Sequence, residues 1–359
     1  MNICIFGAGP GAMAMACRAL DAGHRVGLCE LARFESNLEG FDKNLAIRSE
    51  GLISGRFELA FATTDPAESL GWADLILVVT HAAAHWEISA YCASFANQKP
   101  VILCPGYVGG GWAIDRQIRA GAAGAQPAVV ECSVLPFACR KLSGDTVSIH
   151  GIKRRFMLST IGPNDRTGAG VDFVKELFDG IEQSASPIEA GLNETNFILH
   201  PCVALLNMGY VQGGQPWTFY RQGLTPRIGA LVEAIDGERQ QLMRQLGLAP
   251  VPLTRWMSDF YADQGMRGDS LYEMIYTFPQ FAKSPGPRSL DHRYFREDIA
   301  YGLVPMSSLA GRVGVEMPLT RSLIDLAGFL CNEDFYKTGR DLSDISPPAS
   351  LETQRSQRK

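Results

Sequence analysis

A glycine-rich run near the start of the sequence could bind a phosphate-bearing ligand. Gly7-Ala8-Gly9-Pro10-Gly11-Ala12 has the spacing G-x-G-x-x-G/A, with Ala12 in place of the third glycine. Gly7 would permit a tight turn, Gly9 would let backbone approach a pyrophosphate, and the following helix would offer its N-terminal N–H groups. The run lies between an apolar segment and an Ala-rich one, so the sequence predicts dinucleotide binding here.

Two charged residues bear on the choice between NAD and NADP. Glu30 ends the predicted second strand, where its carboxylate would accept hydrogen bonds from the adenosine ribose and repel a 2′-phosphate. Arg33 follows three residues later and could hold that phosphate if Glu30 turned away. We therefore expect NADH or NADPH as cofactor, with NADH favoured.

Further cofactor contacts are expected where buried strands end. Thr80 ends the apolar run LILVVT, and Pro105 and Gly106 follow the run VILC. Ligands of doubly wound sheets bind beyond the carboxyl ends of the strands. The glycines at 109–111 fit a flexible loop before a helix equally well. His81 and His85 fit ordinary loop or helix positions better than catalytic ones.

A second group of polar residues lies in the apolar second half. His200 follows Asn193 and Asn196 in NETNFILHP, with helical spacing that would place all three on one face. Arg293 and Asp298 belong to the charged run DHRYFREDIAYGLVP. On the pattern alone, a buried histidine with satisfied hydrogen bonds and a solvated helix explain these residues better than a catalytic site does.

The first half has the organisation that a dinucleotide loop requires. Strand-like runs that are apolar on both faces alternate with helical patterns, which is typical of a parallel sheet covered on both sides. The sequence predicts an α/β Rossmann domain with a doubly wound, mostly parallel sheet, and a hairpin insertion between residues 46 and 62. The expected elements are a helix over Pro10–Ala22 and strands over Asn2–Phe6, Arg25–Glu30, Leu75–Thr80, Val101–Cys104 and Ala128–Cys132.

After about residue 187 the pattern becomes helical. Apolar residues recur at three- and four-residue spacing, and several helices begin with proline. We predict a Rossmann domain over 1–187, an all-helical substrate-binding and catalytic domain over 188–345, and a polar, disordered tail over 346–359. The expected helices are Leu192–Tyr210, Pro226–Leu246, Pro305–Val313 and Pro318–Leu330.

Composition excludes several other classes of protein. The 359 residues include 33 Lys and Arg against 38 Asp and Glu, so the net charge of -5 gives no reason to expect nucleic-acid or membrane partners. The start of the sequence lacks a basic stretch before its apolar run. We therefore expect no signal peptide and a cytoplasmic location. The nine scattered cysteines form no C-x-x-C pair, which predicts buried free thiols and no metal site. The apolar helical half leaves a homodimer open.

Motifs along nearly the whole chain resemble the opine dehydrogenase family, also called the octopine/nopaline dehydrogenase or NAD(P)H-dependent opine synthase family. They include GAGPGA, VILCPG, ECSVLPFACR, NETNFILHPCVALLN and LDHRYFREDIAYGLVP, in this order. The resemblance implies a Rossmann domain joined to an all-α domain of the 6-phosphogluconate-dehydrogenase-like type, with an active site between them. It also implies that NAD(P)H reduces the imine formed from an amino acid and an α-keto acid.

The resemblance also implies roles for particular residues. His200 corresponds to the catalytic acid/base and Asp298 to the acid that orients it. Arg293 would bind a substrate carboxylate, and Arg140 would contact the keto acid or the cofactor. Asn196, four residues before His200, is expected at the substrate. These roles suit the chemistry, because histidine exchanges protons near neutral pH and arginine binds carboxylates with two parallel hydrogen bonds.

Two other functions stay open on the sequence. A hydroxyacid or ketopantoate-type dehydrogenase would share the two-domain plan, but it generally relies on a catalytic lysine, and residues 176–281 contain none. A cofactor-binding sensor would be expected to lose the His-Asp-Arg set. The keto acid, of the pyruvate or 2-oxoglutarate type, and the amino acid are not determined. An arginine substrate would need an acidic partner, for which Glu233, Asp236 and Glu238 are available.

Overall fold

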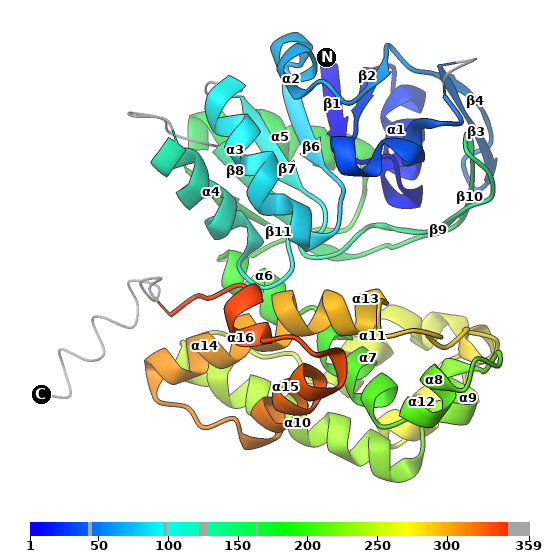
Figure 1. The fold of residues 1–359 in the computed structure, drawn as a ribbon, viewed down its shortest axis with the longest axis vertical. Helices are drawn as coiled ribbons and strands as arrows, with labels where there is room; N and C mark the ends of the chain where they lie inside the picture. The colour runs from blue at the N-terminus through cyan, green and yellow to red at the C-terminus, as the bar shows by residue number, and fades with distance from the viewer. Residues whose placement is uncertain (42–44, 96–98, 122–127, 163, 185, 344–359) are drawn as a thin grey trace, which may run out of the picture. The chain divides into compact units, whose positions relative to one another are not determined.

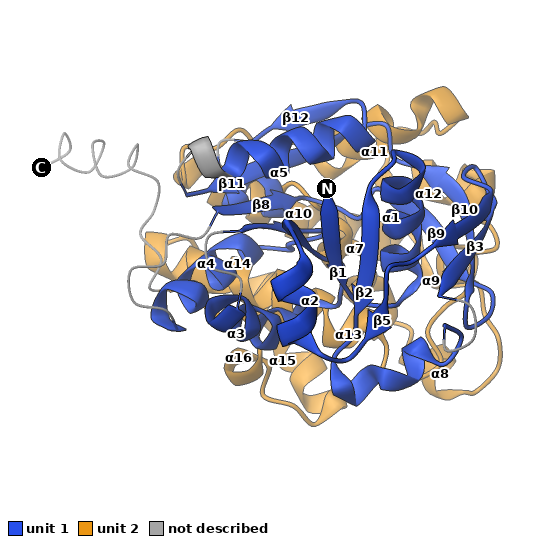
Figure 2. Ribbon diagram, turned by 90° about the horizontal axis from the view of Figure 1, so that it is seen from above, with its two compact units in different colours: residues 1–191 blue, residues 192–359 orange. Residues whose placement is uncertain are grey.

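The computed structural model describes residues 1–41, 45–95, 99–121, 128–162, 164–184 and 186–343 (Figure 1). The chain divides into two compact units, residues 1–191 and residues 192–359 (Figure 2). The boundary that we predicted, after residue 187, falls within the first of these units. The predicted tail, 346–359, lies outside the described residues.

The first unit is built on an eight-stranded sheet in the order β12-β11-β8-β7-β6-β1-β2-β5. Neighbouring strands are parallel except β8 and β11, which are antiparallel. The predicted doubly wound, mostly parallel sheet is confirmed. Its strands are β1 (Asn2–Phe6), β2 (Arg25–Cys29), β5 (Ala62–Thr63), β6 (Leu75–Val78), β7 (Pro100–Leu103), β8 (Ala128–Cys132), β11 (Phe156–Ile161) and β12 (Ile181–Gln183).

Apolar residues on both faces of β1 explain why helices cover both sides of this sheet. Ile3 and Ile5 pack into one core, while Cys4 and Phe6 pack into the other. Successive side chains of a strand point to opposite faces, so each face needs its own cover. Helices α1 (Pro10–Asp21) and α5 (Asn164–Leu177) contribute to the first core, and α2 (Pro66–Trp72), α3 (His85–Phe95) and α4 (Gly110–Gly121) to the second.

A second, four-stranded sheet lies on the other side of α1. Its order is β4-β3-β10-β9, with bounds Gly55–Glu58, Ala46–Gly51, Thr146–Ile152 and Phe137–Lys141. β3 and β4 pair antiparallel, which confirms the predicted hairpin. Helix α1 contacts strands of both sheets, so its small and flexible side chains are buried around nearly its whole circumference.

The second unit is helical throughout residues 192–343, where one isolated bridge joins Thr218 to Pro285. The long α10 is its centre, because it packs against α7, α12, α14 and α15. None of the helices in the described ranges is long and apolar enough to cross a membrane. The helices are α7 (Asn196–Leu205), α8 (Met208–Gln212), α9 (Phe219–Gly223), α10 (Pro226–Gln245), α11 (Leu253–Tyr261), α12 (Leu271–Thr277), α13 (Arg293–Arg296), α14 (Val304–Val313), α15 (Pro318–Cys331) and α16 (Phe335–Thr338), with a π-helical turn over Ile299–Leu303.

The prediction of one helix over Leu192–Tyr210 is wrong. α6 (Pro187–Leu192) ends where that helix should begin, α7 follows after a break, and α8 is separate. Polar side chains at the breaks bond to backbone instead of pointing to solvent. Asn193 accepts a hydrogen bond from the Val251 N–H, and Asn207 donates to the Val203 and Gly223 carbonyls. Such bonds compete with a continuous helix, and helical spacing does not reveal them.

All nine cysteines are described and free of disulfides. Eight are buried and Cys139 is half-buried, as predicted from their scattered positions. Burial raises the pKa of the Cys92 thiol to about 12, so it stays protonated at neutral pH and behaves as a small apolar side chain.

Candidate functional site

The glycine-rich loop contains one glycine that the fold needs and one that leaves open space. Gly7 has φ of +110°, and a Cβ there would lie 2.5 Å from the Val79 carbonyl oxygen. Gly9 has an ordinary φ of -74°, and a Cβ there would meet nothing within 4 Å. Gly7 therefore shapes the turn, whereas Gly9 faces open space that the pyrophosphate of a dinucleotide could occupy.

Two further features beside this loop fit a dinucleotide. The N-cap residue of α1 is Gly9, which has no side chain to cap the helix, so the first N–H groups keep their capacity to bind phosphate. The Thr80 hydroxyl oxygen is buried and has no hydrogen-bond partner among the described residues. Its methyl carbon lies 3.2 Å from the position of a Cβ at Gly7. A buried hydroxyl without a partner is costly, and a bound ligand would supply one.

Glu30 is buried at the end of β2, where its carboxylate bonds to the backbone of the glycine-rich loop. It accepts hydrogen bonds from the Ala8 N–H at 3.0 Å, the Leu31 N–H at 2.9 Å and the Asn37 side-chain amide at 3.0 Å. These bonds hold the carboxylate in place, so turning Glu30 away to admit a 2′-phosphate would break three of them. The predicted contact to the ribose stays a prediction.

Arg33 is exposed, and its guanidinium group is engaged on the surface of the first unit. It pairs with Glu87 of α3 and lies 5.0 Å above the Phe34 ring. Exposed pairs of this kind contribute up to about 1 kcal/mol, so Arg33 is free to change partner when a ligand binds. The predicted binding of a 2′-phosphate by Arg33 stays a prediction.

Gly106 has a packing role that the sequence did not reveal. A Cβ there would lie 2.2 Å from the carboxyl carbon of Glu131, a fully buried residue of β8. Glu131 also accepts a hydrogen bond from the Gly111 N–H at the start of α4. Both glycines make room for this carboxylate. Pro105 and Gly106 nevertheless follow β7 at the edge where the loop lies, so their predicted cofactor contacts remain predictions.

Replacing Gly9 with alanine is expected to separate ligand binding from folding. The new methyl group enters the open space beside the loop, so the Kd for NADH should rise at least about tenfold, which equals about 1.4 kcal/mol. Alanine is a poorer N-cap than glycine, which costs at most about 1 kcal/mol of stability. Titration of nucleotide fluorescence and a thermal melt measure the two effects.

Two glycine variants provide matched controls for this prediction. Gly71→Ala places a methyl group in equally open space on α2, away from the loop, and should leave the Kd unchanged. Gly7→Ala should instead lower stability, by about 1–3 kcal/mol for backbone strain alone, because of its positive φ. Unchanged nucleotide binding by Gly9→Ala would place the pyrophosphate elsewhere.

In the second unit, the structure brings His200 and Asp298 together. His200 Nδ1 lies 2.9 Å from Asp298 Oδ2, and the two side chains are only 6% and 3% exposed. A carboxylate at Nδ1 holds the proton on that nitrogen in the neutral ring. The ring is thereby fixed, and Nε2, on the opposite side, is the nitrogen that would exchange protons with a substrate.

Aromatic rings enclose this pair. The Tyr294 ring stacks on His200 at 4.1 Å, and Phe219 meets His200 edge-on at 6.0 Å. Burial raises the pKa of the Tyr294 phenol, an effect that Arg293 opposes, so Tyr294 stays neutral at physiological pH. Burial likewise raises the pKa of Tyr220 well above its usual value. The rings that enclose the pair are thus uncharged and apolar, which strengthens the interaction of His200 with Asp298.

Arg293 lies beside the pair while exposing its guanidinium group. It begins α13, five residues before Asp298, and its guanidinium carbon lies 5.5 Å from the centre of the Tyr294 ring. The order in space is Arg293, Tyr294 and then His200. The three residues predicted to work together are therefore neighbours within one unit, and their catalytic and binding roles remain predictions.

A close approach of backbone allows the contact between His200 and Asp298. Asp298 immediately precedes the π-helical turn Ile299–Leu303, which packs against α7. A Cβ at Gly302 would lie 2.3 Å from the Phe197 Cβ, one turn before His200. Gly302 therefore lets the turn lie against α7. Sequence reasoning missed this glycine, because only the distance between the two elements gives it a role.

The predicted polar stripe before His200 is only partly present. Asn196 is half-buried in the first turn of α7 and shares a face with His200 four residues later. Asn193 lies before the helix, and its side chain accepts hydrogen bonds from Arg239 and from the Val251 N–H. Asn193 therefore belongs to a structural network and not to the stripe.

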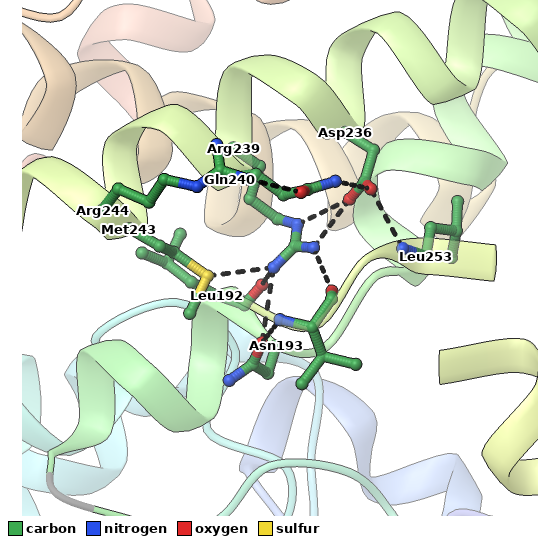
Figure 3. A network of polar contacts seen from close by, with 9 residues as sticks. Leu192, Asn193, Asp236, Arg239, Gln240, Met243, Arg244 and Leu253 are labelled. Atoms are coloured by element: carbon green, nitrogen blue, oxygen red, sulfur yellow. Dashed lines mark hydrogen bonds and ion pairs between the residues drawn. The ribbon is translucent and has the colours of Figure 1, made fainter. Parts of the chain in front are cut away.

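Arg239 of α10 is the centre of that network (Figure 3). Its guanidinium group is fully buried and pairs with Asp236 at 2.7 Å. It also donates to the Leu192 carbonyl at 2.8 Å and to the Val251 carbonyl. Leu192 and Asn193 form the chain that leads into α7, so Arg239 holds the start of the helix that carries His200.

The three acidic residues considered for binding a substrate guanidinium group all have structural partners. Asp236 pairs with Arg239 and accepts from the Leu253 N–H. Glu233 accepts from the Leu271 N–H at 2.7 Å. Glu238 caps α15 by accepting from the N–H groups of Leu319 and Thr320, and from the Thr320 hydroxyl. An arginine substrate would have to use other groups.

Arg140 and its neighbour Lys141 point to opposite faces of β9. Arg140 is exposed, and its contact with the keto acid or cofactor stays a prediction. Lys141 reaches the dinucleotide loop, where its amine donates to the Ala8 carbonyl at 3.3 Å. Sequence reasoning missed Lys141, because no motif links a residue of the inserted sheet to a loop 133 positions earlier.

Comparison with known proteins assigns this chain to a family. Residues 183–331 match the family model described as NAD/NADP octopine/nopaline dehydrogenase, alpha-helical domain. An opine dehydrogenase from Arthrobacter sp. (strain 1C) is 30% identical over 302 residues, covering 84% of this chain and 83% of that protein. The chain belongs to the opine dehydrogenase family. It is accordingly an NAD(P)-dependent oxidoreductase, and the predicted family is confirmed.

Solved structures of opine dehydrogenases share the fold. An octopine dehydrogenase with NADH and L-arginine has a TM-score of 0.78 at 19% identity, over 96% of this chain and 93% of that one. A yersinopine dehydrogenase with NADP+ bound has a TM-score of 0.75 at 16% identity, over 100% and 99% of the two chains. At these identities the likeness concerns the fold alone, and it confirms the predicted pairing of a Rossmann domain with a helical domain.

Proposed function

We propose that this protein is an opine dehydrogenase that uses NAD(P)H to join the amino group of an L-amino acid to an α-keto acid of the pyruvate or 2-oxoglutarate type. The product is an N-(carboxyalkyl) amino acid, and the reverse oxidation uses the same site. The reaction acts on a CH–NH bond. The observation that carries the proposal is the buried pair of His200 and Asp298, with Arg293 beside it.

His200 would move the protons that imine formation requires. Its Nε2 takes a proton from the amine and returns one to the hydroxyl group of the carbinolamine, so that the C–O bond breaks and water leaves as the C=N bond forms. The nicotinamide cofactor, when bound, supplies the hydride that reduces the imine carbon. Asp298 stabilises the imidazolium form of His200 through the bond at Nδ1.

Arg293 and Asn196 are the groups in the second unit suited to orienting the substrates. Arg293 exposes a guanidinium group that can bind a carboxylate with two parallel hydrogen bonds. Asn196 lies one turn before His200 and can donate or accept a hydrogen bond. Arg140, in the first unit, is retained as a candidate contact to the keto acid or the cofactor.

The cofactor site lies in the first unit, at the loop from Gly7 to Ala12. Three features support this assignment: the open space at Gly9, the Thr80 hydroxyl that has no hydrogen-bond partner among the described residues, and the start of α1, whose N-cap glycine has no side chain. Related structures contain NADH in one case and NADP+ in another, so the family tolerates either nucleotide.

A matrix of oxidation assays tests the function. Purified protein is given NADH or NADPH with one keto acid, in the presence or absence of each amino acid. We expect oxidation of the nucleotide only when a keto acid and an amino acid are both present, with a secondary amine as product by mass spectrometry. Oxidation with the keto acid alone would instead establish a hydroxyacid dehydrogenase, and nucleotide binding without any turnover would favour the sensor.

A further inference from the structure

Lys141 links the inserted four-stranded sheet to the cofactor loop. It is the last residue of β9, and its Nζ donates to the Ala8 carbonyl at 3.3 Å and to the Asn37 carbonyl at 3.0 Å. Ala8 belongs to the dinucleotide loop, and Asn37 belongs to the 3-10 helix Ala32–Leu38 that follows β2. In this fold the adenosine ribose of a bound dinucleotide would meet the acidic residue that follows the second strand, here Glu30, which bonds to both segments.

Lys141 and Glu30 share Asn37 as a bonding partner. Asn37 connects them, because its side-chain amide donates to Glu30 while its carbonyl accepts from Lys141. The negative charge that would repel a 2′-phosphate and the positive charge of Lys141 are thus both held to the same two segments, through Ala8 and Asn37. Lys141 also lies 5.8 Å from the centre of the Phe41 ring, which limits where its amine can move.

Arg33 is the less suitable partner for a 2′-phosphate. It is exposed and paired with Glu87, so a phosphate would have to displace a carboxylate. The bonds of Lys141 to described residues are both to neutral carbonyls, and they use two of the three N–H donors of its ammonium group. A phosphate would therefore meet a positioned cation at Lys141 without first breaking an ion pair.

We propose that Lys141 selects the cofactor by binding the 2′-phosphate of NADPH, so that this protein accepts NADPH despite the acidic residue at the end of β2. Glu30 continues to hold the loop through Ala8 and Leu31, and need not turn away. Cofactor selection by Lys141 presupposes the proposed function and deepens it. It also assigns a role to the inserted sheet, which carries the lysine to the loop.

Direct binding of NADPH and NADH, without amino acid or keto acid, tests the role of Lys141. In Lys141→Met the Kd for NADPH should rise about 10- to 100-fold, the range expected for loss of a charge-assisted hydrogen bond. The Kd for NADH should change less than about threefold, because only the ribose hydroxyl remains at that position. Added salt should weaken NADPH binding more in the unaltered protein than in Lys141→Met.

Three further variants make the result specific. Lys141→Arg keeps the charge and should keep most of the NADPH affinity. Arg48→Met removes a charge from the exposed pair of Arg48 with Asp145 on the same inserted sheet, and should change neither Kd. Arg33→Met should have a smaller effect on NADPH than Lys141→Met has.

Several outcomes would overturn the assignment. Equal losses of affinity for NADPH and for NADH in Lys141→Met would mean that Lys141 only supports the loop. A larger loss of NADPH affinity in Arg33→Met than in Lys141→Met would also exclude selection by Lys141. So would unaltered protein that binds NADH alone, and both outcomes would leave the proposed function intact. Unaltered protein that binds neither nucleotide would contradict the proposed function itself.

Discussion

Replacing His200 with asparagine is expected to lower kcat about a thousandfold while leaving the protein folded and able to bind nucleotide. General acid–base catalysis by one side chain contributes about 10²- to 10⁴-fold, and the variant has no group that exchanges protons near neutral pH. Steady-state kinetics with the best substrate pair measures the effect. Near-normal turnover would exclude His200 as the acid/base.

Asparagine is chosen because the pair is buried. The amide nitrogen of asparagine lies near the position of Nδ1 and can still donate to Asp298 Oδ2, which is 2.9 Å from that nitrogen. Alanine would leave the buried carboxylate without its partner, at a cost of about 3–5 kcal/mol. A comparison of His200→Asn with His200→Ala by thermal melting therefore separates catalytic loss from unfolding.

Asp298→Asn tests whether the two residues act as a unit. It should lower kcat less than His200→Asn does, because the histidine remains but is no longer held in the productive tautomer. In the double variant, Asp298→Asn should lower kcat little below the value for His200→Asn alone, since effects within one catalytic unit are not additive. A double variant whose loss equals the product of the two single losses would show that Asp298 acts independently of His200.

Replacing Arg239 with methionine is expected to destabilise the helical unit by about 3–5 kcal/mol, because it leaves Asp236 charged and buried without its partner. The carbonyls of Leu192 and Val251 also lose their donor. For a unit of this size the midpoint of thermal unfolding should fall by about 10 °C. Circular dichroism during heating measures the change.

Arg244→Met is the matched control. Arg244 lies on the same helix (Figure 3), but its side chain is exposed. Its bond to Gln240 lies at the surface, so its loss should change stability by less than about 0.5 kcal/mol. The double variant Asp236→Leu with Arg239→Met removes both charges and should recover part of the loss. Equal melting of Arg239→Met and Arg244→Met would refute the structural role of the network.

Most elements could be predicted because their signals are local. The strands of the large sheet are short apolar runs, and α10 (Pro226–Gln245) follows a 3.6-residue period that starts at a proline. The prediction of one long helix failed at Leu192–Tyr210, where the breaks depend on partners far away. Arg239, for example, lies 46 residues after Asn193, and no periodicity within the segment reports that contact.

The residues of the candidate site were predictable to different degrees. The loop at Gly7 could be read from its spacing, because the positive φ and the helix start are properties of adjacent residues. His200 and Asp298 stood out in the sequence pattern, but their catalytic roles came only from the family resemblance, since each residue alone also fits a structural role. They are 98 positions apart, and their contact depends on Gly302 letting the π-helical turn lie against α7.

The sequence by itself determined the order of the elements, the dinucleotide loop and the family, because these depend on residue types at short spacing. Only the tertiary structure decided which charged side chains are available for chemistry. Asp236 and Glu238 turned out to hold helices together, and Lys141 turned out to reach the cofactor loop. A charged side chain takes its role from the backbone groups and charges that surround it, and packing between distant segments brings those groups together.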